Sequence, residues 1–161
     1  MEKITFKPIG VIRSGFKQAP GTPIQAGTAK HIGAQIEIFD AYAEGLHDLD
    51  GFSHIILLYY FHLSSGHKLK VIPFMDSVER GVFATRAPGR PNSIGFAVVE
   101  LISIEGNILH FKGTDMIDGT PVLDIKPYVP DFDHQNVVKT GWLEKKVKNL
   151  PDKTDDGRFL R

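Results

Sequence analysis

The stretch GFAVVELISIEGNILHFKGT, residues 95–114, contains two apolar runs separated by the polar cluster Glu105-Gly106-Asn107. The runs are rich in β-branched and aromatic side chains, which favour strands, and the glycine and asparagine between them favour a tight turn. The pattern therefore predicts an antiparallel hairpin whose strands cover residues 95–104 and 107–114.

Short apolar runs of this kind recur along the 161-residue chain between its ten prolines and 16 glycines, whereas helical periodicity is scarce. Further strands are predicted over residues 4–13, 34–39, 52–62 and 81–85, with one short helix over residues 41–46. The run from Phe52 to Phe61 is apolar on both faces, which places it in the middle of a sheet or barrel. We therefore predict a single all-β domain, which the polar sequence after Trp142 follows as a mobile tail.

The composition excludes several kinds of site. The chain has no cysteine, so disulfides, zinc–thiolate centres and thiol nucleophiles are excluded. Its seven histidines are scattered without a His-x-x-x-His spacing, and no metal site is expected. The 19 basic residues balance the 19 acidic ones, so any contact with nucleic acid requires a local basic patch.

Signals of export and of two common enzyme classes are also missing. We find neither a signal peptide nor an apolar run long enough to cross a bilayer, which predicts a cytoplasmic protein without membrane contact. The Gly-x-Ser-x-Gly elbow of serine hydrolases and the Walker loop do not occur. The Gly-x-Gly-x-x-Gly fingerprint is absent too, so a Rossmann cofactor site has no support.

The loop GVFATRAPGRPNSIG, residues 81–95, carries Arg86 and Arg90 four residues apart and is stiffened by Pro88 and Pro91. A rigid loop with two guanidinium groups suits a carboxylate or a phosphate, which arginine binds in a bidentate manner. The alternative is two surface arginines on a tight turn. We favour an anion-binding role because the loop is so dense in conformationally restricted residues.

Carboxylates cluster in a second stretch, GTDMIDGTPVLDIKPYVPDFD, residues 113–133. Asp118 lies in a turn, where aspartate most often accepts backbone hydrogen bonds. Asp124 and Lys126 share a face of an extended segment, so they could pair with each other or with the arginine loop. Asp115, which closes the hairpin's second strand, is the better candidate to face a ligand.

Several motifs in these stretches resemble the TsaA/TrmO-like family of tRNA methyltransferases, and the resemblance runs from about residue 6 to residue 130. The matching segments are GVFATR (81–86), RPNxIG (90–95), DGTPxxDIKPY (118–128), PIGVIRS (8–14), Pro23-x-Gln25, Phe52-Ser53-His54 and Phe61-His62. The resemblance implies a barrel-like, non-Rossmann β fold over residues 1–143, followed by a polar C-terminal tail over residues 144–161. It also implies a homodimer with the site near the subunit interface.

The resemblance further implies S-adenosylmethionine as cofactor and tRNA as substrate, with methyl transfer to the N6 nitrogen of threonylcarbamoyladenosine beside the anticodon. Two alternatives stay open: a methyltransferase for another RNA or small-molecule acceptor, and a module that binds the cofactor without turnover. Two positions depart from the family's pattern, Ile24 where many relatives have arginine and Ser93 where many have proline.

Carried over position by position, the resemblance predicts the site residues. The cofactor-binding positions are Pro23, Ile24, Gln25, His62, Leu63, Arg86, Phe96, Lys112, Gly113, Thr114 and Asp115. Within this set, Arg86 is expected at the cofactor's carboxylate and Asp115 at its ribose hydroxyls or amine. The proton acceptor is not identified by the sequence, and its candidates are Asp118, Asp124 and His62. Contacts with RNA are expected from Arg13, Arg90, Asn92 and Lys126.

Overall fold

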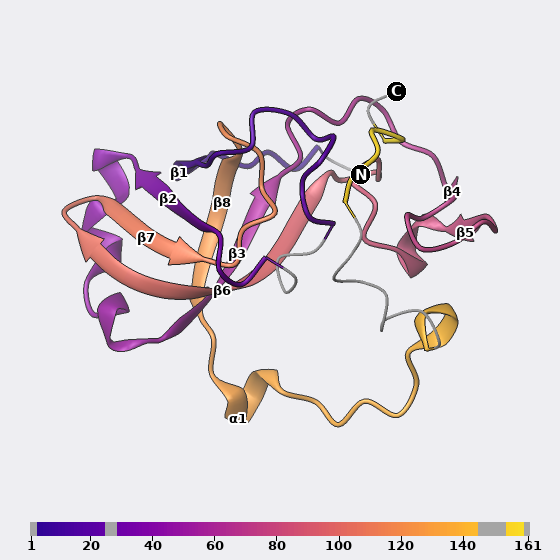
Figure 1. Cartoon of the computed structure of the whole chain (residues 1–161). Helices are drawn as coiled ribbons and strands as arrows, with labels where there is room; N and C mark the ends of the chain where they lie inside the picture. Colours follow the sequence, from indigo (N-terminus) through magenta and orange to yellow (C-terminus); the bar gives the residue numbers. More distant parts are fainter. Residues whose placement is uncertain (1–2, 25–28, 145–153, 160–161) are drawn as a thin grey trace.

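Six antiparallel strands close into a barrel in the structure, a computed structural model that describes residues 3–24, 29–144 and 154–159 (Figure 1). The strands are β1 (Gly10–Arg13), β2 (Gly33–Ile38), β3 (His54–Tyr60), β6 (Ile94–Glu105), β7 (Ile108–Lys112) and β8 (Pro121–Pro127). Their order around the barrel is β1-β2-β7-β6-β3-β8, and β8 pairs with β1 to close it. The predicted all-β, barrel-like fold is therefore confirmed.

The remaining elements are short. A two-stranded ribbon consists of β4 (Lys70–Val71) and β5 (Arg80–Gly81). The helical turns are η2 (Asp40–Leu46), η3 (Leu49–Gly51), η4 (Val82–Ala84), α1 (Pro130–Asp133) and η5 (Gly141–Leu143). The predicted helix over residues 41–46 corresponds to η2, which has 3-10 geometry. Among the described residues no helix is long and apolar enough to cross a membrane.

Alternate residues of β1, β2, β3, β6 and β7 fill the barrel, and β8 contributes Val122. On β3, Ile55, Leu57 and Tyr59 point inward and are buried, while the residues between them face outward. The interior is dominated by isoleucine, leucine and valine, whose branched side chains pack well on a pleated surface. As expected from its two apolar faces, β3 lies between two neighbours, β6 and β8.

The predicted hairpin forms between β6 and β7, with Glu105 opposite Ile108. Gly106 has a φ of +63°, a left-handed conformation that glycine adopts without steric cost and that the tight turn requires.

Two strand predictions need correction, and one strand of the barrel was missed. Residues 81–85 are not one strand: Gly81 ends β5, and Val82–Ala84 form the 3-10 turn η4, because the Thr85 amide and hydroxyl both donate to the Val82 carbonyl. Phe83 is left 77% exposed. Of residues 4–13 only Gly10–Arg13 form a strand, since Ile4 and Phe6 lie outside the barrel and are exposed. Strand β8 was not predicted.

The expected mobile tail over residues 144–161 is only partly described. Residues 145–153 and 160–161 lie outside the described part. Residues 154–159 are not free, because Thr154 forms a β-bridge with Pro23 and the Phe159 ring packs edge-on against Phe74. The backbone of this segment also bonds the connection after β1, where the Asp155 amide donates to the Thr22 carbonyl, and the mobility of the tail stays a prediction.

Candidate functional site

A cavity of about 420 Å3 lies at one end of the barrel, where the chain leaves β1, β3 and β7 and enters β2, β6 and β8. Its wall is built from residues of the connections 19–24, 61–64, 85–90 and 115–120, together with the adjoining strand ends. Antiparallel pairing brings these connections to the same end, although they are far apart in sequence. The volume is within the roughly 300–1,000 Å3 range of small-ligand pockets.

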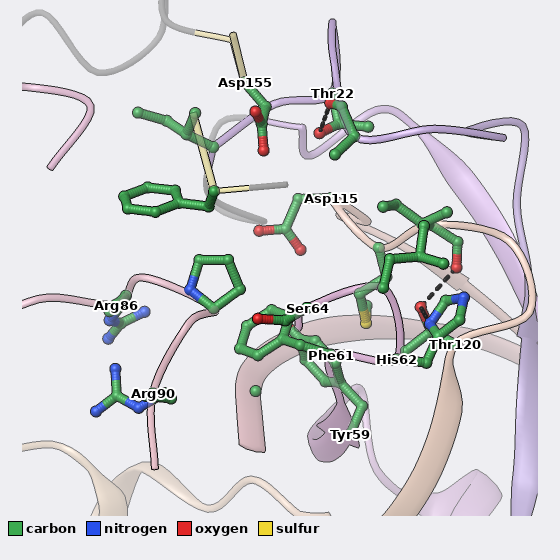
Figure 2. A pocket seen from close by; sticks show the side chains of 18 of the residues that line it. Thr22, Tyr59, Phe61, His62, Ser64, Arg86, Arg90, Asp115, Thr120 and Asp155 are labelled. Carbon is green, nitrogen blue, oxygen red and sulfur yellow. Dashed lines mark hydrogen bonds between the residues drawn. The ribbon is translucent and has the colours of Figure 1, made fainter. Parts of the chain in front are cut away.

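Two guanidinium groups and two carboxylates face this cavity from different segments. Figure 2 shows Arg86 and Arg90 side by side in one part of the wall and Asp115 and Asp155 in another. The Arg90 Nη1 donates to the Thr85 carbonyl at 2.9 Å, which ties the loop into its conformation. The Arg86 guanidinium carbon lies 5.9 Å from the Phe96 ring centroid, within cation–π range. The cavity therefore separates positive from negative charge.

Tyr59 also lies in the cavity wall and is only 5% exposed. Burial raises the pKa of its phenol well above the usual value of 10.0; the negative charge of Asp115 raises it further, and Arg86 lowers it. The hydroxyl is therefore neutral at physiological pH. Gly95 faces this ring across the β3–β6 pair, and a Cβ there would lie 2.7 Å from the ring's Cδ2 and closer to two further ring atoms. Glycine is required at position 95 to accommodate the Tyr59 ring.

His62 is the titratable imidazole in the cavity wall. Its Nδ1 lies 3.4 Å from the Thr120 Oγ1, and that hydroxyl donates its single proton to the Ile117 carbonyl at 2.7 Å. The proton between the two side chains therefore belongs to His62, whose Nδ1 donates, so that Nε2 carries the lone pair. Burial lowers the pKa of His62 from 6.5, which favours this neutral form.

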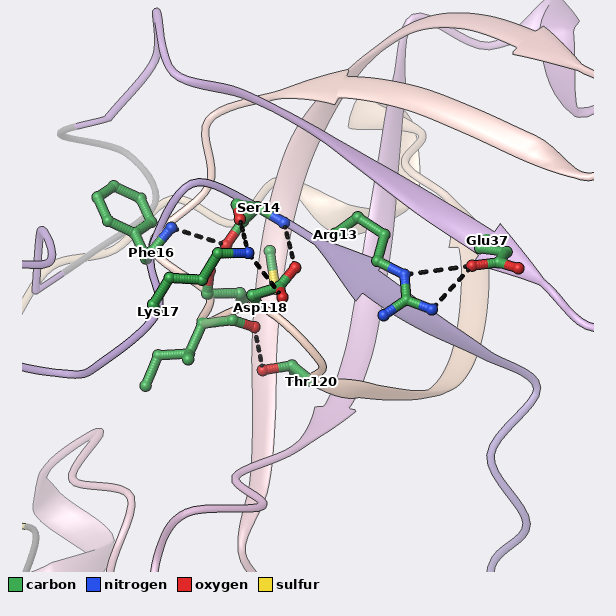
Figure 3. Close-up of polar contacts among 9 residues, drawn as sticks. Arg13, Ser14, Phe16, Lys17, Glu37, Asp118 and Thr120 are labelled. Carbon is green, nitrogen blue, oxygen red and sulfur yellow. Dashed lines mark hydrogen bonds and ion pairs between the residues drawn. The ribbon is translucent and has the colours of Figure 1, made fainter.

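The loop that carries Asp115 is held in place by the segment after β1 (Figure 3). The Ser14 hydroxyl donates to the Met116 carbonyl at 2.8 Å, and the Ser14 amide donates to Asp118 Oδ1 at 3.0 Å. Lys17 Nζ binds the other Asp118 oxygen at 2.8 Å. The hydrogen bonds from Lys17 and Ser14 lower the pKa of Asp118 below its usual value of 3.8. Asp118 thus has the turn-stabilising role expected of it.

Comparison with known proteins identifies the family. The family model described as tRNA-methyltransferase O N-terminal domain matches residues 11–134. The chain belongs to this family. A probable S-adenosyl-L-methionine-binding protein of Pyrococcus abyssi is 53% identical over 157 residues, which cover 98% of this chain and 85% of that protein.

Two longer proteins are also similar to this chain. The tRNA (adenine(37)-N6)-methyltransferase of Escherichia coli is 38% identical over 140 residues, which cover 81% of this chain and 60% of that protein. The crystal structure of TrmO from Pseudomonas aeruginosa superposes with a TM-score of 0.73 at 38% identity, covering 88% of this chain and 63% of that one. The chain thus spans less than two thirds of the length of these two relatives.

The cofactor residues predicted from the family resemblance fall into three groups. Pro23, Ile24, His62, Leu63, Arg86, Phe96 and Asp115 line the cavity. The run Lys112, Gly113 and Thr114 does not line it but leads into Asp115; the Gly113 amide donates to the Ile32 carbonyl, and Thr114 Oγ1 accepts from the Met116 amide. Gln25 lies outside the described residues. Contact of these residues with a cofactor stays a prediction.

The other predicted residues lie mostly away from the cavity. Asp118 does not line it, and Asp124 lies at the opposite end of the barrel, paired with Lys126 at 2.7 Å. Arg13 binds Glu37 at 3.0 Å. Arg90 lines the cavity, and Asn92 is an exposed residue of the same loop. The expected contacts of these four RNA candidates, Arg13, Arg90, Asn92 and Lys126, stay predictions.

Sequence reasoning missed several polar residues of the cavity wall, among them Tyr59, Ser64 and Asp155. Tyr59 looked like a core residue of an apolar strand, and only the glycine of the RPNxIG motif opposite it gives a signal. Ser64 follows Phe61-His62 by two residues without a pattern of its own. Asp155 is one of many charged residues in the C-terminal segment. Among the described residues no group of three or more metal-binding side chains occurs.

Proposed function

We propose that this protein is an S-adenosylmethionine-dependent methyltransferase that modifies the N6 nitrogen of adenosine 37 in tRNA, in its threonylcarbamoyl form. The observation that carries the proposal is the cavity at the barrel end, which holds paired guanidinium groups, a carboxylate and aromatic walls. The similarity to enzymes named tRNA (adenine(37)-N6)-methyltransferase supports the choice of substrate.

The residues present fit the cofactor. Arg86 would bind the carboxylate of its amino-acid part, and Asp115 would accept hydrogen bonds from its ammonium group or ribose hydroxyls. Ser64 adds a polar contact, because its Oγ is buried in the wall and has no hydrogen-bond partner among the described residues. Phe96 and Ile94 supply apolar surface for the adenine. When bound there, S-adenosylmethionine supplies an electrophilic methyl group.

His62 is proposed as the proton acceptor. The acceptor nitrogen of threonylcarbamoyladenosine carries a proton that must leave as the methyl group arrives. The Nε2 of His62 can take that proton, directly or through one water, because Nδ1 already donates to Thr120. The other two candidates are less suitable, since Asp118 and Asp124 are in ion pairs with lysines outside the cavity wall.

The protein is further proposed to be a cytoplasmic homodimer. Three cross-strand pairs, Ile56–Val98, Leu58–Phe96 and Tyr60–Ile94, place apolar side chains on the outer face of β3 and β6. The chain after β8 also exposes Phe132, Val137 and Val138, the last of them by 90%. A second copy would bury both surfaces, and Phe96 and Ile94 would bring the interface beside the cavity.

Light scattering of the wild type and of a Val137→Glu/Val138→Glu double variant tests the dimer. The wild type is expected at twice the mass of one chain, and the variant at a smaller average mass, because a charge at each position opposes burial. A monomeric wild type would refute the dimer. Fractionation of cells with an antibody to the protein tests the cytoplasmic location.

Nucleoside mass spectrometry of tRNA incubated with the protein and S-adenosylmethionine tests the activity. Methylated threonylcarbamoyladenosine is expected from the wild type and from Lys70→Ala, which removes an exposed positive charge outside the cavity, but not from Arg86→Ala. Cofactor binding without a methylated nucleoside would contradict the proposed activity and support a binding module. Methylation of a different nucleoside would contradict the proposed substrate.

A further inference from the structure

The C-terminal segment Thr154–Phe159 borders the cavity although it lies 20 residues beyond the family match, which ends at residue 134. The Asp155 amide donates to the Thr22 carbonyl, and the Gly21 amide donates to the Asp155 carbonyl, both at 2.8 Å. Thr154 forms an isolated antiparallel β-bridge with Pro23. The segment is thus attached next to positions predicted to bind the cofactor.

A second attachment fixes the other end of the segment. Arg158 Nη1 donates to the Pro73 carbonyl at 3.0 Å, and its guanidinium carbon lies 5.1 Å from the Phe74 ring centroid. Asp156 holds the same guanidinium at 2.6 Å, and the Phe159 ring packs against Phe74 with centroids 4.9 Å apart. Because both ends are held, the position of the residues between them is defined by backbone and side-chain contacts.

Asp155 extends from this segment into the cavity wall. Its Oδ1 accepts from the Gly157 amide at 2.6 Å, and within the described part of the chain no donor is bonded to Oδ2. Figure 2 shows the carboxylates of Asp155 and Asp115 in the same part of the cavity, away from Arg86 and Arg90. Burial raises the pKa of Asp155 above 3.8, and the charge of Asp156 adds to this. A cation beside Asp155 would offset this unfavourable burial.

We propose that Asp155 is a cofactor-binding residue whose carboxylate contacts the positively charged part of S-adenosylmethionine. The inference rests on the function proposed above. The cofactor carries an ammonium and a sulfonium cation, and the cavity offers two carboxylates, Asp115 and Asp155, in the part opposite the guanidinium groups. The pocket is then completed by a residue outside the family's matched domain.

Isothermal titration calorimetry of the full chain with S-adenosylmethionine and with S-adenosylhomocysteine, which lacks the sulfonium charge, tests the proposal. Asp155→Asn is expected to weaken binding of S-adenosylmethionine by about tenfold to a hundredfold, the range of a hydrogen bond to a charged group. An equal loss for both ligands assigns the contact to the ammonium group, and a larger loss for S-adenosylmethionine assigns it to the sulfonium. Either result supports the proposal.

Asp50→Asn, which removes an exposed carboxylate outside the cavity, is the control and is expected to bind like the wild type. Without ligand, the Asp155→Asn variant should have a Tm equal to or above that of the wild type, because a partly buried charge is removed. If Asp155 had only a structural role, the variant's Tm would be lower than that of the wild type. If the Asp155→Asn variant does not fold, the same titrations are made with Asp155→Ser, which keeps an oxygen that can accept from the Gly157 amide.

Unchanged affinity of the variant for S-adenosylmethionine would overturn the proposal while leaving the proposed function intact, provided that the wild type binds the cofactor and methylates tRNA. A wild type that binds no S-adenosylmethionine would overturn both.

Discussion

Replacing Gly95 by alanine tests the contact through which the barrel shapes the pocket. The added methyl carbon would lie 2.7 Å from Cδ2 of Tyr59 and closer to two further atoms of the same ring. The ring is 5% exposed and is packed against Phe61, with centroids 5.3 Å apart. Either the ring must move toward the cavity or β3 and β6 must separate.

The expected loss of stability follows from this overlap. Insertion of an extra methyl group into a packed interior costs about 1–3 kcal/mol, and the close approach of several ring atoms places Gly95→Ala near the upper end. In a domain of about 150–250 residues each kcal/mol lowers Tm by about 2–4 °C. We therefore expect a Tm about 6–12 °C lower, together with weaker binding of S-adenosylmethionine.

A double-mutant cycle with Tyr59→Val isolates the contact. Thermal unfolding is followed by circular dichroism for the wild type, for both single variants and for the double variant. Because valine lacks the ring, Gly95→Ala should cost little in the Tyr59→Val background, which gives a coupling of about 2–3 kcal/mol. An equal loss in both backgrounds would refute the reasoning, since the strain would then come from the strand backbone.

Other predictions concern single contacts. Asp118→Asn removes the ion pair with Lys17 and should lower stability by about 1 kcal/mol at pH 7, since Lys17 is largely exposed. The depressed pKa of Asp118 contributes stability above pH 3.8, so in urea denaturation the difference should vanish as the pH falls below that value; persistence at pH 2 would contradict it. His62→Gln should abolish most methyl transfer but retain cofactor binding. Because burial lowers the pKa of His62, the wild-type rate should fall only below pH 6.5, and a decline beginning above pH 7 would argue against His62 as the base. Gly10→Ala places a Cβ 2.5 Å from the Glu37 carbonyl oxygen and should lower Tm by several degrees, measured by calorimetry; an unchanged Tm would show that β1 can shift away.

The parts of the fold that depend on local sequence could be predicted. The β6–β7 hairpin follows from Gly106 and its flanking apolar runs, because both strands and the turn are contiguous. Strand β8 could not be recognised in the same way. Pro121 and Pro127 resemble strand breakers, but they stand at its two ends, where proline is tolerated, and its partners β1 and β3 are distant in sequence.

The site was predictable where motifs mark it. Arg86 and Asp115 stood out from a rigid loop and from the end of a hairpin, and both line the cavity. Tyr59 was not predicted because a tyrosine that points inward from an apolar strand is usually a core residue. The charges of Asp115 and Arg86 that act on it come from other segments and are not evident from the strand's own sequence. Asp155 was missed because hydrogen bonds between distant backbone segments, rather than its own sequence pattern, bring it to the pocket.

Closure of the barrel has a consequence for how the protein folds. Gly10 pairs with Val122, so the β1–β8 seam, the strand pairing that closes the barrel, joins residues more than a hundred positions apart. Such non-local pairing is slow because chain entropy is lost before the contact is gained. The cavity wall needs segments from both sides of that seam, residues 19–24 and 115–120. We expect refolding chains to gain strand structure before they gain affinity for the cofactor, so that ligand binding reports the completion of folding.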